Sequence, residues 1–160
     1  MTYTKQTLQR DLAAMGLTGT ETILIHSSMK SIGAVEGGAD TVLDALMEFF
    51  AEGLLLLPTH TWQFIDQDHP VFDVRRSPCC VGILPELFRQ RPGVVRSLHP
   101  THSIAACGRG AAAYLAGELE NNTPAPPAAA TTVYGRSAER SCCWVSVMLG
   151  TPSFTAWRRC

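Results

Sequence analysis

The sequence predicts an α/β fold with a mixed, largely parallel sheet and flanking helices. Two short, continuous apolar runs at residues 22–26 and 54–57 are typical of strands that are buried on both faces. Between them, residues 39–51 repeat apolar side chains at helical spacing. Because a strand, a helix and a second strand follow one another, we expect a βαβ unit with parallel strands.

The other predicted elements surround this unit. Residues 4–15 form an amphipathic pattern with Leu8, Leu12 and Met15 on one face, and Gly16 ends it. Short helices are predicted at 82–89 and 111–119. The apolar segments 94–95 and 104–107 are predicted strands on either side of a polar kink at 96–103. The long irregular segment 59–80 is typical of a functional lid or binding loop.

Length and composition narrow the class of protein. The chain has 160 residues and 46% hydrophobic content, enough for one domain with a real core. We expect a cytoplasmic protein, because there is neither a membrane-spanning apolar run nor a signal-peptide pattern. The six cysteines lack metal-site or disulfide-framework spacing and are interpreted as free thiols. A net charge of −1 argues against general nucleic-acid binding, and nothing indicates the oligomeric state.

Two polar stretches adjoin predicted strand ends, where open α/β sheets bind ligands. Residues 27–38 are rich in Ser and Gly, contain Lys30 and lead into a predicted helix N-terminus, which favours an anion such as a phosphate. The stretch matches no Walker or GxGxxG motif, so an ordinary loop stays open. Residues 96–103 contain an Arg, two His, two Ser and a Thr, which favours a functional loop over a solvated turn.

Histidines and aspartates allow two further interpretations. His60, His99 and His102 suggest a zinc-dependent hydrolase as an alternative, although Pro100 disturbs the spacing of the last two and no His pair has i, i+4 helical spacing. The aspartates of segment 59–80 form either a negative wall for a cationic ligand, with Trp62 and Phe64 as stacking surface, or a hydrated acidic loop.

These stretches, taken in order from about residue 4 to residue 123, resemble the aminoglycoside 3-N-acetyltransferase family. The resemblance rests on residues 24–33, on residues 35–39, on Leu57-Pro58-Thr59-His60-Thr61-Trp62 and above all on Arg91-Pro92-Gly93-Val94-Val95-Arg96-Ser97-Leu98-His99-Pro100-Thr101-His102-Ser103. It implies acetyl transfer from acetyl-CoA to the 3-amino group of an aminoglycoside antibiotic, hence antibiotic resistance, with no metal. A CoA-binding remnant without catalysis is a further alternative.

The resemblance also suggests roles for individual residues. We expect residues 1–123 to be an acetyl-CoA-binding α/β domain whose cofactor-binding residues are Ser27, Ser28, Lys30, Ser31, Gly33, Arg96, Ser97, His99 and Thr101. The expected substrate-binding residues are Thr59, His60, Trp62, Asp66, Asp68 and Asp73. An amine that attacks a thioester needs a general base. The family's catalytic His lies in a later Asn-Thr-x-x-His stretch followed by Glu, which is absent here, so His102 and His60 are the fallback bases.

Residues 124–160 differ from the rest of the sequence. Residues 121–160 contain a single acid, Glu139, and four arginines, and nothing there matches the family motif. Reading Ser141-Cys142-Cys143-Trp144-Val145 two bases later, with suitable codons, gives Leu-Leu-Leu-Gly and then Asn-Thr-x-x-His. We therefore hypothesise an out-of-frame tail and an α/β domain that is incomplete at the C-terminus. We expect the printed chain to be a poor or inactive enzyme.

Overall fold

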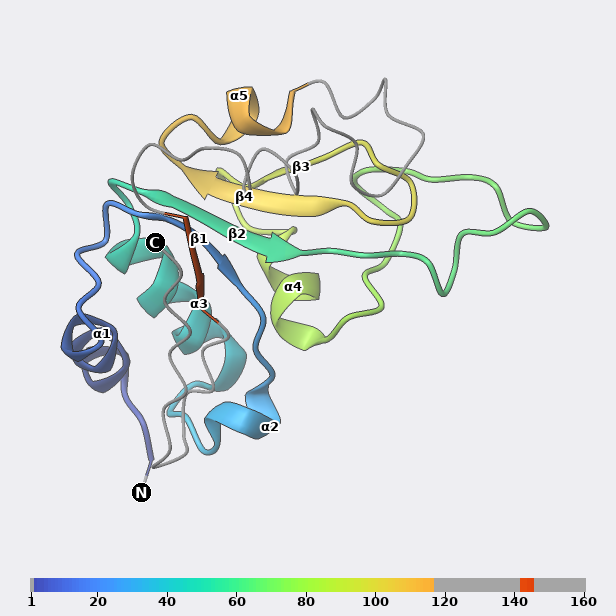
Figure 1. The fold of residues 1–160 in the computed structure, drawn as a ribbon. Coiled ribbons are helices and arrows are strands. Elements are labelled where there is room, and N and C mark those ends of the chain that lie inside the picture. The colour runs from blue at the N-terminus through green and yellow to red at the C-terminus, as the bar shows by residue number, and fades with distance from the viewer. Residues whose placement is uncertain (1, 117–141, 146–160) are drawn as a thin grey trace.

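The computed structural model describes residues 2–116 and the backbone of residues 142–145. Its centre is a mixed five-stranded sheet in the order β3-β4-β2-β1-β5 (Figure 1). The strands are β1 (Thr22–Ile25), β2 (Leu54–Pro58), β3 (Val95–Arg96), β4 (Ile104–Gly108) and β5 (Cys142–Val145). The prediction of a mixed α/β sheet is confirmed, although parallel pairing is confined to β5, β1 and β2, while β4 and β3 run antiparallel.

The predicted βαβ unit is present. β1 and β2 are parallel neighbours, with Thr22 opposite Leu54 and Leu24 opposite Leu56. Helix α3 (Gly38–Phe49) connects them and buries Val42, Leu43, Ala45 and Leu46. All five residues of β2 are buried. This is expected of a continuous apolar run that forms a strand covered on both faces.

The remaining helices cover the sheet unequally. Helices α1 (Lys5–Ala14), α2 (Met29–Ile32), α3 and α4 (Ile83–Phe88) contribute to the core on one face, and α5 (Ala111–Leu115) packs on the other (Figure 1). Alternation along the strands divides the core. Leu55 and Leu57 of β2 face the larger cluster, whereas Leu54 and Leu56 face the smaller one.

Local signals explain where several helices begin and end. Thr4 caps α1 by accepting the amide of Thr7, and the helix ends before Gly16, which has a positive φ of 82°. The helix predicted at 82–89 is α4, and the one predicted at 111–119 is α5, which ends at Leu115. Residues 117–119 and the tail at 124–141 and 146–160 lie outside the described residues.

Two elements were not predicted. Helix α2 is a single turn inside the stretch interpreted as a loop, and Ser28 caps it by accepting the amide of Ser31 at 3.2 Å. Strand β5 pairs in parallel with β1, with Thr22 opposite Cys142 and Ile25 opposite Val145. Only the backbone of β5 is described.

The long irregular segment 59–80 projects from the body of the domain as an extended arm (Figure 1). We call residues 62–77 the arm. Its path contains turns and bends but neither a helix nor a strand, as the sequence predicts. No helix in the described part of the chain is both long and apolar enough to cross a membrane.

Candidate active site at the histidine edge

The sheet topology brings three strand ends to one edge. Because β1 and β2 are parallel and β4 is antiparallel to β2, the carboxyl ends of the first two lie beside the start of β4. The pairing continues beyond the strands, since the Thr59 amide donates to the Ser103 carbonyl at 2.8 Å and the Thr61 amide to the Thr101 carbonyl at 2.9 Å. The residues that follow β1 and β2 therefore meet the polar kink.

Histidines gather at this edge. The ring centroids of His60 and His102 are 5.0 Å apart, and those of His99 and His102 are 5.7 Å apart. His26 follows β1 and acts electrostatically on His60. We call these four residues the histidine edge. The site residues expected from the sequence do not include His26. Its position could have indicated it, because His26 directly follows a strand that is parallel to the strand before His60.

Burial favours the neutral form of the imidazole at three of these positions, His26, His60 and His102. The pKa of His60 is lowered to about 4, first by burial and then by the neighbouring histidines. Burial also lowers the pKa of His26, and burial followed by the charge of His99 lowers the pKa of His102. Neutral imidazole is the form that accepts a proton, so the edge holds bases in their working state at pH 7.

Hydrogen bonds orient two of the rings. The Nδ1 atom of His99 accepts the amides of Thr101 at 3.3 Å and His102 at 3.0 Å, which leaves the ring proton on Nε2. The Nδ1 atom of His102 lies 2.9 Å from the Thr101 hydroxyl. Among the described residues, buried His60 Nδ1 and Ser27 Oγ have no hydrogen-bond partner. Both atoms are buried, so a ligand or water would reach them only after neighbouring groups move.

Pro100 allows the kink to turn within a few residues. The Thr61 hydroxyl donates to the Pro100 carbonyl, so the kink is held against the residue that follows His60. Ser97 reinforces the turn, because its amide donates to the Ile104 carbonyl at 2.8 Å and its hydroxyl accepts the Ile104 amide at 3.0 Å. The strand, kink and strand predicted from the sequence are confirmed.

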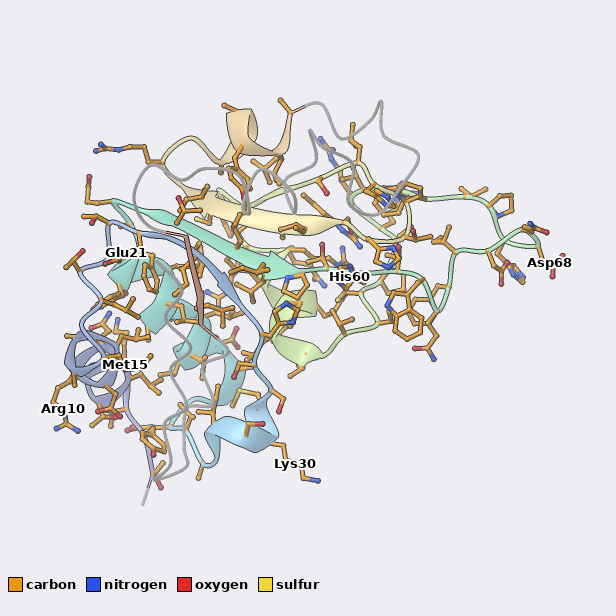
Figure 2. All side chains as sticks on the ribbon, in the orientation of Figure 1. Arg10, Met15, Glu21, Lys30, His60 and Asp68 are labelled. Atoms are coloured by element: carbon orange, nitrogen blue, oxygen red, sulfur yellow. The ribbon has the colours of Figure 1, made fainter. Side chains whose placement is uncertain are left out.

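The predicted cofactor-binding residues fall into two groups. Arg96, Ser97 and His99 are buried within the kink, with Thr101 half-buried beside them. Ser31 lies in α2, and Ser28 and Gly33 cap its two ends, with the two serine hydroxyls 2.9 Å apart. Lys30 is exposed and points away from both the domain and His60 (Figure 2). Arg96 donates to Ser103, Thr59, Val74 and Ser77, so its guanidinium is already engaged by protein acceptors.

The predicted substrate-binding residues separate as well. Thr59 is fully buried beside His60, whereas Trp62 is 53% exposed.

Asp68 lies at the outer end of the arm, well away from His60 (Figure 2). Asp66 accepts the amides of Asp68 and His69 there, and Asp73 accepts those of Arg75 and Arg76. The carboxylates stabilise turns of the arm, and backbone hydrogen bonds lower the pKa of Asp66 and Asp73.

The zinc alternative finds no support in the geometry. Among the described residues, no three His, Cys, Asp or Glu side chains are arranged to hold a metal ion. His99 cannot present Nδ1 to a metal, because two backbone amides already occupy that atom. The described cysteines, Cys79, Cys80 and Cys107, are free thiols.

A mixed α/β domain with histidines clustered at the carboxyl edge of its parallel strands places these side chains where open α/β sheets bind their ligands. The chain matches the model for the family described as aminoglycoside 3-N-acetyltransferase over residues 24–151, and it belongs to that family. The match continues past residue 123, where the motifs recognised in the sequence end.

The chain is also similar to individual proteins and to solved structures. The chain is 37% identical over 131 residues to aminoglycoside N(3)-acetyltransferase VII of Streptomyces paromomycinus, covering 71% of this chain and 46% of that protein. Among solved structures, it matches aminoglycoside acetyltransferase AAC(3)-Xa with a TM-score of 0.75 and 33% identity, covering 82% of this chain and 52% of the other. A structure titled AAC-IIIb binary with CoASH matches with a TM-score of 0.65 and 29% identity, over 74% of this chain and 50% of the other. The chain spans about half the length of the curated relatives it matches.

Proposed function

We propose that this protein transfers an acetyl group from acetyl-CoA to the 3-amino group of an aminoglycoside antibiotic and thereby confers resistance. The observation that carries the proposal is the pair of neutral imidazoles of His60 and His102, 5.0 Å apart at the strand-end edge of a domain of this family. Family membership and the CoA complex of a relative support acetyl-CoA as co-substrate. We place the reaction in the cytoplasm, where acetyl-CoA is made.

The reaction needs a base and a polarised carbonyl. The nitrogen lone pair of the deprotonated amine attacks the thioester carbonyl carbon, the carbonyl oxygen gains negative charge, and collapse of that intermediate breaks the carbon–sulfur bond and releases CoA. An aminoglycoside amine is protonated at neutral pH, so it must lose a proton before it attacks, and the new amide nitrogen loses a second one. In this chain we assign proton removal to His60 or His102, whose burial keeps each ring neutral.

His60 is the better placed of the two. Its Nδ1 atom has no hydrogen-bond partner among the described residues, so no protein group competes for the proton. His102 shares its Nδ1 atom with the Thr101 hydroxyl at 2.9 Å and has only Nε2 to offer. The depressed pKa of His60 makes it a weak base, which opposes proton transfer, because an efficient general base has a pKa near the working pH. Its advantage over His102 is therefore one of hydrogen bonding alone.

For the cofactor, we propose that the α2 segment and the kink act together. Small side chains at Ser27, Ser28, Ser31 and Gly33 allow a phosphate to approach the backbone, and Lys30 supplies a cation on an exposed, long side chain. Ser97, His99 and Thr101 complete the set at the kink. Arg96 acts on this set only indirectly, because its guanidinium already donates to protein acceptors.

For the substrate, we propose that the arm and the histidine edge each contribute. Thr59, His60 and Trp62 lie at the base of the arm, and the exposed indole of Trp62 offers a face to a sugar ring. Asp66, Asp68 and Asp73 give the arm negative charge that attracts a polycationic ligand. Since Asp68 lies at the outer end of the arm, these carboxylates act by attraction at a distance unless the arm folds over the edge.

The test is thiol release from acetyl-CoA in the presence of gentamicin, together with calorimetric binding of CoA. We expect CoA binding in the wild-type chain, with drug-dependent thiol release that is slow because the family's catalytic His and Glu are absent from the sequence. Replacing the working base, by His60→Gln or His102→Gln, should lower the rate by about 10²–10⁴-fold. The matched control is His69→Gln, an exposed histidine on the arm with a side chain that is 77% exposed, and it should keep the wild-type rate.

Three outcomes separate the possibilities. CoA binding without drug-dependent thiol release at any enzyme concentration would make the chain a CoA-binding module and overturn the transferase assignment. Release that is abolished by a chelator and restored by zinc would point to metal chemistry instead. Release that survives in both histidine variants would leave acetyl transfer intact but remove His60 and His102 as bases.

A further inference from the structure

Arg96 is a buried cation that is held by neutral acceptors. Its side chain belongs to a residue that is only 7% exposed, and the guanidinium lies 5.1 Å from the centre of the Phe72 ring. Burial, followed by the charge of nearby Arg89, lowers its pKa to about 10, so it remains protonated at neutral pH. Within the described residues it forms no ion pair. Its positive charge is therefore stabilised chiefly by hydrogen bonds to neutral acceptors. The positions of these acceptors indicate the role of Arg96.

The acceptors of Arg96 come from three separate segments. Nε donates to the hydroxyl of Ser103, at the start of β4, over 3.1 Å. One terminal nitrogen donates to the carbonyl of Thr59, after β2, over 2.8 Å. The other donates to the carbonyls of Ser77 at 2.6 Å and Val74 at 3.3 Å, on the part of the arm that returns to the domain. Four hydrogen bonds from one planar group thus join the kink, the end of β2 and the base of the arm.

The Thr59 carbonyl receives a second hydrogen bond. The Ser103 hydroxyl donates to it over 2.7 Å, so Arg96 and Ser103 hold the same oxygen from two sides. That oxygen belongs to the peptide unit joining Thr59 to His60. On the far side of His60, Thr61 donates to the Pro100 carbonyl, and the Cys80 amide donates to the His60 carbonyl over 2.8 Å. His60 is therefore held through its backbone on both sides, while its own Nδ1 atom has no partner.

A second arginine secures the same part of the arm. Arg89, with a side chain that is 6% exposed, forms an ion pair with Glu86 and donates to the Arg75 carbonyl over 2.7 Å. Glu86 also accepts the Cys79 amide at 2.7 Å. Residues 73–77 form their own turn, in which the Ser77 amide donates to the Asp73 carbonyl at 2.8 Å. The two arginines thus fix the base of the arm and leave its outer end to project.

We propose that Arg96 is a positioning residue that holds His60 beside His102 by anchoring the Thr59–His60 peptide unit to the kink and to the base of the arm. It rests on the proposed function in one respect only, which is the catalytic use of His60 and His102. It differs from the role of a direct phosphate ligand, because a guanidinium with four of its five N–H groups committed to buried protein acceptors has little left for an anion. Lysine cannot substitute, since it lacks the planar fork that reaches acceptors in several directions.

The experiment follows the imidazoles by NMR in the full 160-residue chain with ¹⁵N-labelled histidine. Each ring is titrated in the wild type, in Arg96→Lys and in Arg96→Met. We expect the pKa of His60 to rise by about one unit or more in both variants, because a loosened peptide unit exposes the ring to water. The matched control is Arg109→Met, which removes an exposed arginine paired with Glu52 and should leave His60 unchanged.

A loss of fold is separated from a loss of position by two further measurements. His69, on the exposed arm, reports general unfolding when its resonance shifts together with that of His60. If Arg96→Met fails to fold by circular dichroism, Ser103→Ala decides, because it removes one acceptor of Arg96 and one donor to the Thr59 carbonyl and should raise the pKa of His60 in the same direction by less. A folded Arg96→Met chain, or failing that a folded Ser103→Ala chain, with His60 unchanged would overturn the proposal.

The same variants distinguish this proposal from the proposed function. The histidine titrations by NMR need no turnover. The positioning role can therefore be tested even if the wild-type chain is inactive. Where turnover is measurable, Arg96→Lys should lower kcat at least tenfold with the KM for acetyl-CoA unchanged. A raised KM with kcat unchanged would instead identify Arg96 as a ligand of the cofactor and contradict the positioning role.

Discussion

The carbonyl oxygen of Gly53 lies 2.3 Å from the point that a Cβ atom on Gly108 would occupy. Gly108 ends β4 with a φ of +108°, and the amide of the next residue, Arg109, donates to that same carbonyl over 2.8 Å. The start of β2 and the end of β4 thus approach as closely as two backbones can. This contact lies at the opposite end of the strands from the histidine edge, where it sets the register of the two strands.

Gly108→Ala should destabilise the domain by about 2–4 kcal/mol, because its Cβ meets backbone that cannot move without breaking the β2–β4 pairing. Gly110 is the matched control. It also has a positive φ, of +75°, but nothing lies within 4 Å of its Cβ position, so Gly110→Ala should cost only about 1 kcal/mol. Thermal unfolding of the three proteins gives the measurement. Equal losses in both variants would show that strain in φ, and not the close approach, limits this position.

Acid should destabilise the protein through His60. The ring has a pKa of about 4 in the folded chain and about 6.5 when unfolded, so the unfolded state binds the proton more readily. The free energy of unfolding is therefore undiminished by this group above pH 6.5, falls as the pH drops towards 4, and reaches its full loss below 4. Allowing for solvent screening of a half-buried ring, we expect a loss of about 1–2 kcal/mol.

Urea unfolding between pH 4 and 7 measures this effect in the wild type and in His60→Gln. The variant should show the shallower dependence on pH across that interval, since it has no ring to protonate. An unchanged slope in His60→Gln would mean that other groups cause the acid sensitivity.

Lys30 provides a test of the cofactor proposal. The chain contains two lysines, Lys5 and Lys30. If Lys30 reaches a phosphate of CoA, then Lys30→Ala should weaken CoA binding by about 1–3 kcal/mol, which is roughly a 5- to 150-fold rise in Kd. Lys5→Ala is the control, because Lys5 pairs with Glu48 at 2.8 Å between α1 and α3. Calorimetry that finds both variants equal to the wild type would remove Lys30 from the site.

The nucleotide sequence tests the origin of the tail. We predict that codons 120–160, read in the minus-one register, encode an Asn-Thr-x-x-His stretch followed by Glu. The reason is that Ser141-Cys142-Cys143-Trp144-Val145 and the residues after it permit codons that restore this motif. Sequencing of the gene settles the matter. Stop codons in that register, or a different peptide, would contradict the frame hypothesis.

Local patterns sufficed for the main elements. The apolar runs of β1 and β2 are long enough for strands and too short for helices, and the spacing of Val42, Leu43 and Leu46 between them is helical. The kink could be located because Pro100 interrupts a polar stretch between two apolar ones. Helix α2 and strand β5 were missed, since a four-residue element presents too few positions for a period to emerge.

The sequence by itself therefore determined the α/β class, the parallel β1–β2 pair and the concentration of polar residues at strand ends. Only the tertiary structure decided what those residues do. The family resemblance suggests Arg96 as a cofactor-binding residue, yet its acceptors Thr59 and Ser77 lie 37 and 19 positions away in the chain. Likewise, the neutrality of His60 depends on burial and on neighbouring histidines brought there by strand pairing. Hydrogen bonding and burial depend on distances in space, and these are set by the packing of distant segments.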